Sequence, residues 1–498
     1  MNSRKPITID LVDNREYQLI RDGKCYLQDP VTKKKICVAG EKGKARWNNP
    51  QCWDAVRKFV ADARANPKGS QIFILREDCY SHDTEDDFLT VKFERQDFSV
   101  HTGNLVGSIV RSGEEAGDAV GRVSIGSRFG DAFLRHIISD ADGFLAVNDG
   151  GGSDESHDGY DWLLGYLWNV KFKNAYRLGM PKCYTTKHES LVAPRGQIDV
   201  LGYYAYSKRG RVSCEYRDLS YDNPAASLFV QTWKVLNSKA STQPFCGRTA
   251  NICQAFQQAT RGITRKNSEL LAVRPFVNAF YSEYNKLIDL SKAILKHWGS
   301  EFSTKNRADA ILFDISMLFE YYLRKLLKRN GFQMVPKETE YLTIPTGTKM
   351  GKLKPDLVFG IGDGVGVFDV KYKYFKFSEG VRREDVFQLH TYIGQYGNHQ
   401  AVRACGFLYP ITEKRWRDQR KDAAAERVVL TFPMSQQMHE TIFCVGFLVI
   451  PSTAENNMSS SDFRRELSPW IDRLVHQLGE VFSTAEHRRI GVSLAEAR

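Results

Sequence analysis

The sequence lacks the long apolar runs that place a protein in a membrane. None of its 498 residues belongs to an unbroken apolar stretch of about 18 residues, the length that crosses a bilayer as a helix. The first ten residues, MNSRKPITID, contain no apolar signal core. We therefore expect a protein that stays in the cytoplasm and has no membrane partner.

Cysteine pairs of the kind that bind metals are also missing. Ten cysteines are scattered along the chain without a CxxC pair, and only Cys246 and Cys253 lie close together in the sequence. This spacing excludes zinc knuckles and iron–sulfur clusters of the usual pattern and favours reduced, mostly buried thiols. The chain also lacks a GxxxxGK(S/T) loop, so it has no P-loop with which to hold a nucleoside triphosphate.

Low-complexity and charge-dominated segments are absent as well, which argues against a disordered chain. Hydrophobic residues make up 42% and aromatic residues 12% of the sequence, enough to build real cores. The length predicts two to three domains. An excess of 70 Lys and Arg over 59 Asp and Glu gives a formal charge of +11, which favours polyanionic partners without proving one.

Hydrophobic patterning predicts an α/β multidomain protein with three parts. Residues 1–105 form an N-terminal α+β module with one helix, Pro50–Asn66, among short strands at Tyr17–Ile20, Gln71–Leu75 and Phe88–Phe93. Residues 106–299 form a middle region that is helical from Val106 to about Lys187, followed by a strand pair and more helices. Its expected elements are helices Arg128–Ile138 and Tyr160–Gly179, the strand pair within Arg195–Leu219, and helix Pro275–Trp298.

The pattern of residues 300–498 predicts a third domain, with a central mixed sheet flanked by helices. A helix over Arg307–Arg329 precedes a hairpin, and a second helix, Glu384–Tyr396, follows it. The remaining elements are strands Ala404–Tyr409, Arg427–Thr431 and Thr441–Ile450, and a closing helix, Ser460–Phe482.

The hairpin segment KPDLVFGIGDGVGVFDVKYKYF, from Lys354 to Phe375, carries charged residues inside apolar strands. Because side chains alternate along a strand, Asp369 and Lys371 share one face. A turn centred on Gly362-Asp363 places Asp356 opposite Asp369, and a turn centred one residue later places Asp356 opposite Lys371. Both registers gather the three polar groups into one patch.

Two carboxylates that face each other across a strand pair repel unless a cation lies between them. A hard, oxygen-ligated ion such as Mg²⁺ accepts one or two carboxylates and keeps water and phosphate oxygens as its other ligands. Such an ion activates water and stabilises charge on a phosphate, and a nearby lysine can assist. The alternative interpretation, from spacing alone, is that these are ordinary strand-end and solvent-facing residues.

Two helices carry further candidates. Glu320 lies on the flank of the apolar stripe in ILFDISMLFEYYLRKLLKRNGF, where it can reach the edge of the sheet or pair with Arg324 four residues on. Gln388 and Tyr392 are also four residues apart, so they share one face of their helix. They either hydrogen-bond around the carboxylates, or Tyr392 is a plain core aromatic.

The order of these residues resembles the PD-(D/E)xK nuclease superfamily, in the branch with a RecB-like glutamine–tyrosine motif. A helix glutamate is followed by Pro-Asp, then Asp-Val-Lys, then Gln-Leu-His-Thr-Tyr. Within that superfamily, MLFEYYLRKLL, KPDLVF, FDVKYK and DVFQLHTY resemble the nuclease domain of the McrC-like subunits of McrBC-type modification-dependent restriction systems. Upstream, APRGQIDV and SCEYRDLSYDNPAASLFVQTWKVL resemble the middle region of that family.

The resemblance implies a Mg²⁺-dependent DNA endonuclease subunit, with Mn²⁺ as a possible substitute, that defends against foreign or viral DNA. In this interpretation Asp356 and Asp369 hold the metal, Glu320 completes the ligand shell, and Lys371 positions the attacking water or stabilises the phosphate. Gln388 and Tyr392 support the site. Lys373 contacts the DNA backbone or simply faces solvent.

The resemblance also implies partners. These are modified, methylated double-stranded DNA and a hexameric McrB-like AAA+ GTPase, which the subunit stimulates and to which residues 106–299 would bind. Two alternatives remain open at this point. The chain could be a catalytically silent activator or assembly subunit of such a motor, or a nuclease of another defence or repair system.

Overall fold

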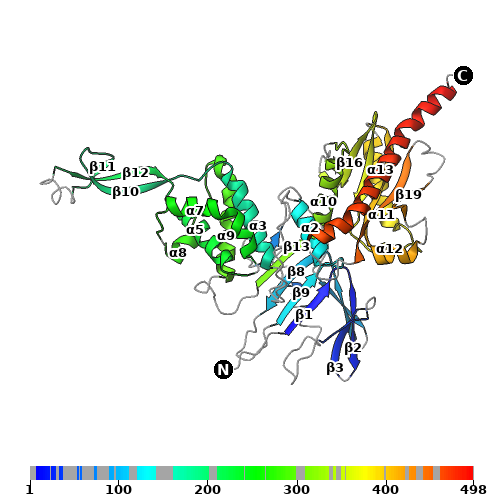
Figure 1. The fold of residues 1–498 in the computed structure, drawn as a ribbon, viewed down its shortest axis with the longest axis horizontal. Helices are drawn as coiled ribbons and strands as arrows, with labels where there is room; N and C mark the ends of the chain where they lie inside the picture. Colours follow the sequence, from blue (N-terminus) through cyan, green and yellow to red (C-terminus); the bar gives the residue numbers. More distant parts are fainter. Residues whose placement is uncertain are drawn as a thin grey trace. The chain divides into compact units, whose positions relative to one another are not determined.

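The computed structural model describes most of the chain (Figure 1). The described residues are 7–22, 24–29, 33–37, 53–54, 56–58, 72–75, 89–94, 97–111, 121–141, 161–200, 210–240, 242–263, 265–298, 309–335, 340–343, 349–353, 355–397, 400–420, 426–432, 441–452 and 460–496.

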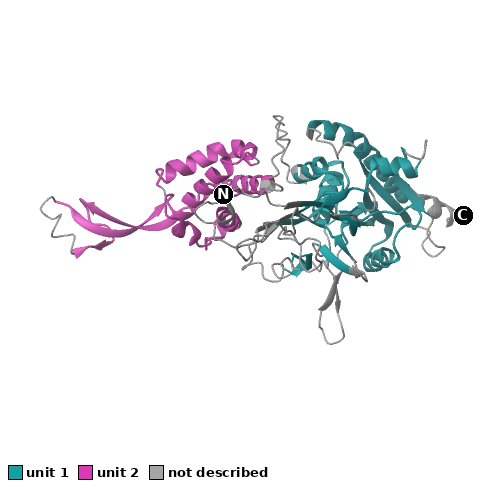
Figure 2. Cartoon of the chain, turned by 90° about the horizontal axis from the view of Figure 1, so that it is seen from below, with its two compact units in different colours: residues 1–155, 310–498 teal, residues 156–309 magenta. Residues whose placement is uncertain are grey.

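The chain forms two compact units, coloured separately in Figure 2. Unit 1 consists of residues 1–155 together with residues 310–498, and unit 2 consists of residues 156–309. Unit 2 is therefore an insertion in unit 1. These limits differ from the expected division at residues 105 and 299, because the N-terminal and C-terminal parts of the chain belong to one unit.

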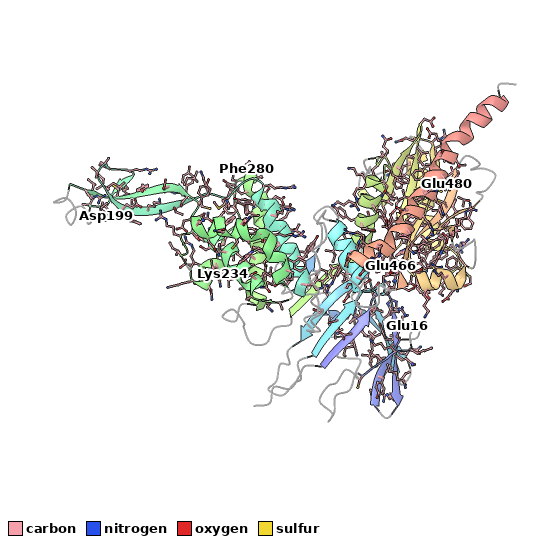
Figure 3. All side chains as sticks on the ribbon, viewed as in Figure 1. Glu16, Asp199, Lys234, Phe280, Glu466 and Glu480 are labelled. Carbon is pink, nitrogen blue, oxygen red and sulfur yellow. The ribbon has the colours of Figure 1, made fainter. Side chains whose placement is uncertain are left out.

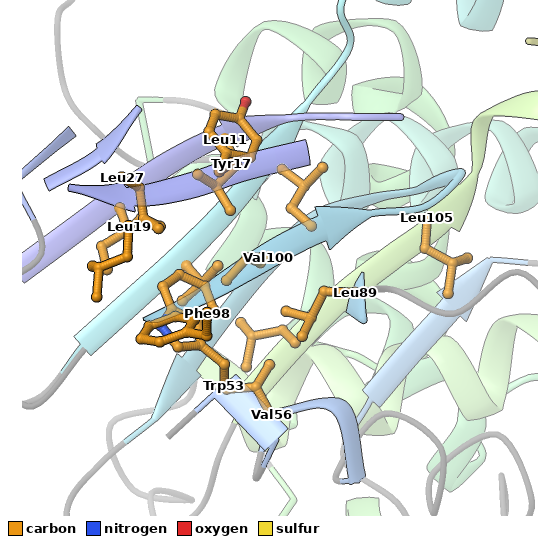
Figure 4. Close-up of a cluster of buried hydrophobic side chains, with 14 of the residues drawn as sticks. Leu11, Tyr17, Leu19, Leu27, Trp53, Val56, Leu89, Phe98, Val100 and Leu105 are labelled. Carbon is orange, nitrogen blue, oxygen red and sulfur yellow. The ribbon is translucent and has the colours of Figure 1, made fainter. Parts of the chain in front are cut away.

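Unit 1 begins with two five-stranded sheets. The first has the order β1-β9-β8-β13-β5, with bounds Ile7–Val12, Gly121–Gly126, Leu105–Arg111, Asp309–Asp314 and Ile72–Leu75. The second has the order β4-β3-β2-β7-β6, with bounds Lys35–Cys37, Lys24–Gln28, Glu16–Asp22, Asp97–Thr102 and Leu89–Glu94. A cluster of buried side chains, including Tyr17, Trp53 and Val100, joins the two sheets (Figure 4).

The three expected N-terminal strands are confirmed as β2, β5 and β6. Of the expected helix at residues 50–66, only Trp53, Asp54 and residues 56–58 are described, and these are helical. The expected helical pattern from Val106 onward is wrong at its start, since β8 and β9 occupy that stretch. Their alternating, β-branched sequences fit a buried strand; they pair with each other, and each also has a partner far away in the sequence, β13 for β8 and β1 for β9.

Helix α2, Asp131–Ala141, confirms the next expected helix and packs against two helices of the C-terminal part, α10 and α13. The expected helix at residues 307–329 is correct only from Ile315 onward. Residues 309–314 form strand β13, and helix α10, Ile315–Arg329, follows directly. Asp314 makes this abrupt change possible, because its carboxylate accepts the backbone N–H groups of Ser316 and Met317 as an N-cap.

The C-terminal part of unit 1 is built on a mixed sheet, as expected. Its strand order is β16-β17-β18-β20-β19, with bounds Leu357–Ile361, Gly364–Val370, Val402–Thr412, Ile442–Ile450 and Val429–Phe432. The inner pairs, β17 with β18 and β18 with β20, are parallel, and the two outer pairs are antiparallel. Ten successive residues of β18 are buried, so both faces of the sheet are covered.

Three helices accompany this sheet. Helix α11, Arg383–Gly397, packs on β17 and β18, and helix α13, Ser460–Glu496, packs on β18 and β20. Helix α12, Glu413–Gln419, follows β18. A separate small ladder pairs β14, Glu340–Thr343, with β15, Lys349–Leu353.

The hairpin of β16 and β17 adopts the first of the two expected registers. Leu357 pairs with Phe368 and Ile361 pairs with Gly364, so the turn is centred on Gly362-Asp363. Gly362 has a φ of 55°, which suits glycine at the first central position of a tight hairpin turn. This register continues to place Asp356 opposite Asp369.

Unit 2 combines helices with a small antiparallel sheet. The main helices are α3 at Asp161–Tyr176, α5 at Pro224–Asn237, α6 at Gln243–Cys246, α7 at Ala250–Ala259, α8 at Asn267–Leu271 and α9 at Ser282–Trp298. The sheet has the order β10-β12-β11, with bounds Cys183–Leu191, Val212–Ser220 and Gln197–Ile198. Figure 3 shows Asp199 beside this sheet and Lys234 among the helices.

Two expectations for unit 2 need correction. The strand β12 was expected to pair with residues that start at Arg195, but its main partner is β10, and β11 contributes only Gln197 and Ile198. The expected helix from Pro275 begins later, at Ser282, after a single 3₁₀ turn at Ala279–Tyr281. The eight described cysteines are all free thiols. No described helix combines the length and apolarity that crossing a membrane requires.

Gly406 in β18 offers a test of how tightly the mixed sheet is packed. A Cβ at this position would collide with the backbone carbonyl oxygen of Cys444 on β20. We predict that Gly406→Ala destabilises the protein by about 1–3 kcal/mol, because the strands must move apart. Gly394→Ala is the matched control, since Gly394 lies in α11 with no atom near its Cβ position.

The control should raise stability by about 0.5–1 kcal/mol through helix propensity. Thermal melting of the two variants against wild type measures both effects. Equal melting temperatures for wild type and Gly406→Ala would contradict the packing described for β18 and β20.

Candidate active site

The hairpin brings two carboxylates together at one end of the mixed sheet. Asp356 directly precedes β16, and Asp369 lies in β17 opposite it. The Asp356 Oδ2 atom accepts a hydrogen bond of 2.8 Å from the backbone N–H of Val370, which fixes the side chain against the neighbouring strand. Asp369 is only 2% exposed, so it is not a solvent-facing strand residue.

The neighbouring carboxylates shift the pKa of Asp356. Burial, followed by the nearby charges of Asp369 and Glu320, raises the pKa of Asp356 well above its ordinary value. The Asp369 Oδ2 atom is buried and accepts no hydrogen bond of normal geometry from the described residues, although the Lys371 ammonium lies 2.6 Å away. This pair therefore has acceptor capacity that the described protein groups leave unused.

Lys371 is the cation of this patch. Its Nζ lies 2.6 Å from Asp369 Oδ2 and 3.4 Å from Asp385 Oδ1, and it donates a hydrogen bond of 2.6 Å to Gln388 Oε1. Burial favours loss of its proton, but the charges of Asp369 and Asp385 and the contact with Asp369 outweigh burial and raise its pKa above the ordinary value. The side chain is therefore a charged ammonium at neutral pH.

Asp385 was not identified from the sequence. It lies in the first turn of α11 and is 4% exposed. Its carboxylate forms ion pairs with Lys371 and Lys373, and the Lys373 Nζ atom is 3.0 Å from Asp385 Oδ1. The sequence carried one usable signal. Asp385 precedes Gln388 by three residues, which places both on the helix face that meets the lysines of β17.

Gln388 and Tyr392 join the patch from the same helix. The Gln388 Nε2 group donates a hydrogen bond of 2.8 Å to the Tyr392 hydroxyl, while its Oε1 accepts Lys371. Burial, with the nearby charge of Asp369, raises the pKa of Tyr392 to about 12, so the phenol remains neutral. Tyr392 is thus both a core aromatic and a partner of the polar patch.

Glu320 pairs with Arg324 and also lies close enough to influence Asp356. It forms the i,i+4 ion pair with Arg324, and the Arg324 Nη2 group also donates a hydrogen bond of 2.7 Å to the backbone carbonyl of Asp356. Glu320 contributes to the raised pKa of Asp356, so its charge reaches the carboxylate pair. Its side chain is 12% exposed.

The donor set is compatible with a hard divalent cation. Among the described residues, no cluster of three or more His, Cys, Asp or Glu side chains forms a complete protein cage. Mg²⁺ does not need such a cage, because it binds through one or two carboxylates and keeps waters and substrate oxygens as ligands. The buried Asp369 Oδ2 atom, which has an ion pair but no hydrogen bond of normal geometry, and the repulsion from Asp356 are what a cation would relieve.

Comparisons with known proteins place this chain in a family. The family model described as "McrBC 5-methylcytosine restriction system component" matches residues 100–410, which is more than half of the sequence. A search of curated proteins finds no match.

Solved structures show weaker likenesses. One is from a half-complex of a tetradecameric assembly of Thermococcus gammatolerans McrB AAA+ hexamers with bound McrC. It has 15% identity and a TM-score of 0.47, and the match covers 93% of this chain and 99% of that one. Another, from the Thermococcus gammatolerans McrBC complex, has 16% identity and a TM-score of 0.32, with coverages of 65% and 88%. With both TM-scores below 0.5, the family assignment rests on the sequence match.

The raised pKa of Asp356 predicts a pH-dependent weakness of the metal-free protein. The folded state keeps a proton on this carboxyl that the unfolded state loses above its ordinary pKa of 3.8. Stability therefore falls as pH rises from that value through the folded pKa. Asp356→Asn keeps an oxygen that accepts the Val370 N–H and removes the charge. The variant should therefore not show the fall in stability with rising pH that Asp356 causes.

The measurement is thermal melting in EDTA from mildly acid to alkaline pH, with exposed Asp472→Asn in α13 as the control. We expect the melting curve of Asp356→Asn to rise above that of wild type as pH increases, by about 1–2 °C for each kcal/mol of repulsion removed. Parallel pH profiles for wild type and Asp356→Asn would show that the carboxylate pair carries no repulsion.

Proposed function

Because this chain belongs to the McrBC 5-methylcytosine restriction system component family, we propose that it is the DNA-cleaving subunit of such a system. The reaction would be Mg²⁺-dependent hydrolysis of a phosphodiester bond within DNA. The observation that carries this proposal is the Asp356–Asp369 pair, of which Asp369 is buried, with the Lys371 ammonium against it. The mixed sheet that positions these groups is, in this proposal, a PD-(D/E)xK nuclease core.

Each residue of the patch has a role in this reaction. Asp356 and Asp369 would hold the metal, and Glu320 would complete its surroundings. Bound Mg²⁺ supplies a water of lowered pKa and offsets negative charge on the phosphate. Lys371 is charged and fixed by three partners, so it can orient the attacking water or stabilise the pentacovalent phosphate without reorganising.

The supporting groups keep Lys371 in place. Gln388 accepts the lysine through its carbonyl oxygen, and the neutral Tyr392 hydroxyl orients the amide of Gln388. Lys373 is 40% exposed and held by Asp385, so it is placed to contact a backbone phosphate that enters the site. These contacts form a continuous chain of hydrogen bonds and ion pairs from α11 to the carboxylates.

The proposed partner is an AAA+ motor. The sequence has no P-loop of its own, and McrC in the Thermococcus gammatolerans assembly is bound to McrB AAA+ hexamers. We propose that this chain likewise works with a hexameric McrB-like GTPase on modified double-stranded DNA and stimulates its GTP hydrolysis. A silent activator would have little use for an intact carboxylate pair and a buried lysine, so the complete patch favours the enzyme.

Asp369→Ala tests the chemistry. Cleavage of methylated plasmid by the chain with its motor, GTP and Mg²⁺ should fall by at least about 10²-fold, because metal binding and the partner of Lys371 are both lost. Exposed Asp472→Ala is the matched control. GTPase stimulation should survive in both variants. Wild-type cutting by Asp369→Ala would make this patch structural and place the cleaving residues elsewhere, and GTPase stimulation without any cutting by wild type would favour the silent activator.

Metal binding has a test that does not depend on activity. Saturating Mg²⁺ should raise the melting temperature of wild type at pH 8. The free energy of unfolding should increase by about 2.7 kcal/mol when the free ion is at 100 times its dissociation constant. Asp369→Asn should lose this response, and Asp472→Asn should keep it. An equal Mg²⁺ response in Asp369→Asn and wild type would place the metal elsewhere.

A further inference from the structure

Asp385 is a buried carboxylate beside the site whose part in the reaction has not yet been explained. It is 4% exposed and lies in the first turn of α11, a helix that packs on β17. Its Oδ1 atom lies 3.0 Å from the Lys373 ammonium and 3.4 Å from the Lys371 ammonium. Two cations therefore compensate this buried acid, and one of them, Lys371, is shared with Asp369.

The Lys371 ammonium has two anionic partners at unequal distances. Asp369 Oδ2 lies 2.6 Å away and Asp385 Oδ1 lies 3.4 Å away, so Asp369 is the tighter partner in this structure. The Lys371 side chain is 11% exposed, so water cannot fully replace a lost partner. The backbone N–H of Lys371 donates a hydrogen bond of 2.9 Å to the Leu408 carbonyl oxygen, which fixes the main chain. A change at Asp369 therefore acts on the side chain of Lys371.

A divalent cation at the carboxylates changes the balance between these two partners. In the proposed function Asp369 holds Mg²⁺, and a cation on this carboxylate repels an ammonium that lies 2.6 Å from one of its oxygens. That oxygen, Oδ2, is also the atom without a hydrogen bond of normal geometry from the described residues. Lys371 and the metal thus compete for the same carboxylate, and the buried ammonium needs a second acid when the metal binds.

Asp385 meets the requirements for that second acid. Among the described residues, it is the other acid whose carboxylate forms an ion pair with Lys371. Gln388 also accepts this ammonium, but a neutral amide compensates a buried charge less well than an opposite charge does. The side chain of Lys373, the closer partner of Asp385, is 40% exposed, so water can solvate its ammonium when Lys371 moves nearer.

We propose that Asp385 is a positioning residue that takes over the Lys371 ammonium when a divalent cation occupies Asp356 and Asp369. The ammonium then stays beside the metal, held by Asp385 and Gln388, and no longer competes for Asp369. In this role Asp385 touches neither the metal nor the phosphate, since it acts through Lys371. The inference rests on the proposed function, because it concerns the same metal and the same lysine.

A plain charge effect has to be separated from this role. Any acid near the site attracts Mg²⁺, so loss of a negative charge weakens metal binding to some extent without involving Lys371. Glu384 provides a matched control for charge. It is the neighbouring acid in the first turn of α11, and it is exposed, whereas Asp385 is buried against the lysines.

The test is a double-mutant cycle on Mg²⁺ binding, which does not depend on cleavage. Isothermal titration calorimetry at pH 8 measures the Mg²⁺ dissociation constant of the full chain. The variants are Asp385→Asn, Lys371→Met and the two combined, with Glu384→Gln as the control. Thermal melting in EDTA shows whether each variant is folded. Lys371→Gln, which keeps a donor for Asp369, replaces Lys371→Met in the cycle if the methionine variant does not melt cooperatively.

We expect Asp385→Asn to weaken Mg²⁺ binding by about tenfold, because the ammonium then stays on Asp369. Lys371→Met should bind Mg²⁺ about tenfold more tightly than wild type, since the competing cation is gone. Adding Asp385→Asn to Lys371→Met should change the affinity little, because no ammonium is left to position. Glu384→Gln should bind like wild type.

Three results would overturn the proposal. An equal loss from Asp385→Asn with and without Lys371 would mean that Asp385 only adds charge to the site. Wild-type affinity in Asp385→Asn would mean that Lys371 needs no second acid. Binding by Lys371→Met that is no tighter than in wild type would mean that the lysine and the metal do not compete, and this result is independent of the Asp385 variant.

The outcome also separates this inference from the proposed function. If Mg²⁺ binding depends on Asp369 and the plasmid is cut, but the cycle shows no coupling between Asp385 and Lys371, the positioning role fails and the nuclease stands. If wild type binds no Mg²⁺ and cuts no plasmid with its motor, both proposals fail.

Discussion

Repulsion between Asp356 and Asp369 is the constraint around which the site is organised. Two carboxylates at directly opposed positions of a hairpin destabilise it, and burial makes the repulsion worse. Every neighbouring donor offsets part of this cost. The Val370 N–H and the Lys371 ammonium act on the carboxylates directly, and Arg324 ties the backbone of Asp356 to the helix that bears Glu320. What these donors leave unsatisfied is the capacity that a cation can fill.

The reverse face of the same strand explains how such a site is held rigid. Tyr372 follows Lys371 and points the other way, into a buried cluster with Arg128 and Phe129, whose ring is 5.6 Å from that of Tyr372. Arg128 in turn pairs with the fully buried Asp13 of the N-terminal sheets. A buried ion pair adds little net stability, but it penalises any arrangement that separates its partners. The orientation of β17 and of the residues that follow it is therefore fixed by residues from the beginning of the chain.

The sequence predicted which polar residues gather at the hairpin better than it predicted the fold around them. The shared face of Asp369 and Lys371 was predictable because strand periodicity is two, whereas the choice between the two hairpin registers came only from the structure. Gln388 and Tyr392 were predictable from helical spacing. Asp385 was missed because an acid in the first turn of a helix is common for electrostatic reasons alone, and only the tertiary contact with Lys371 and Lys373 distinguishes it.

The missed strands share a physical cause with the unexpected division into units. β8 and β9 pair with each other, but β8, β9 and β13 each also have a partner strand far away in the sequence, and local pattern carries no information about such partners. β13 follows the end of unit 2 and runs without a loop into α10, since Asp314 ends the strand and caps the helix at once. The chain therefore returns from its insertion into a strand that leads, within a few residues, to Glu320. Only a short stretch of sequence therefore separates the end of unit 2 from Glu320. The sequence pattern predicted a single helix, Arg307–Arg329, for this stretch.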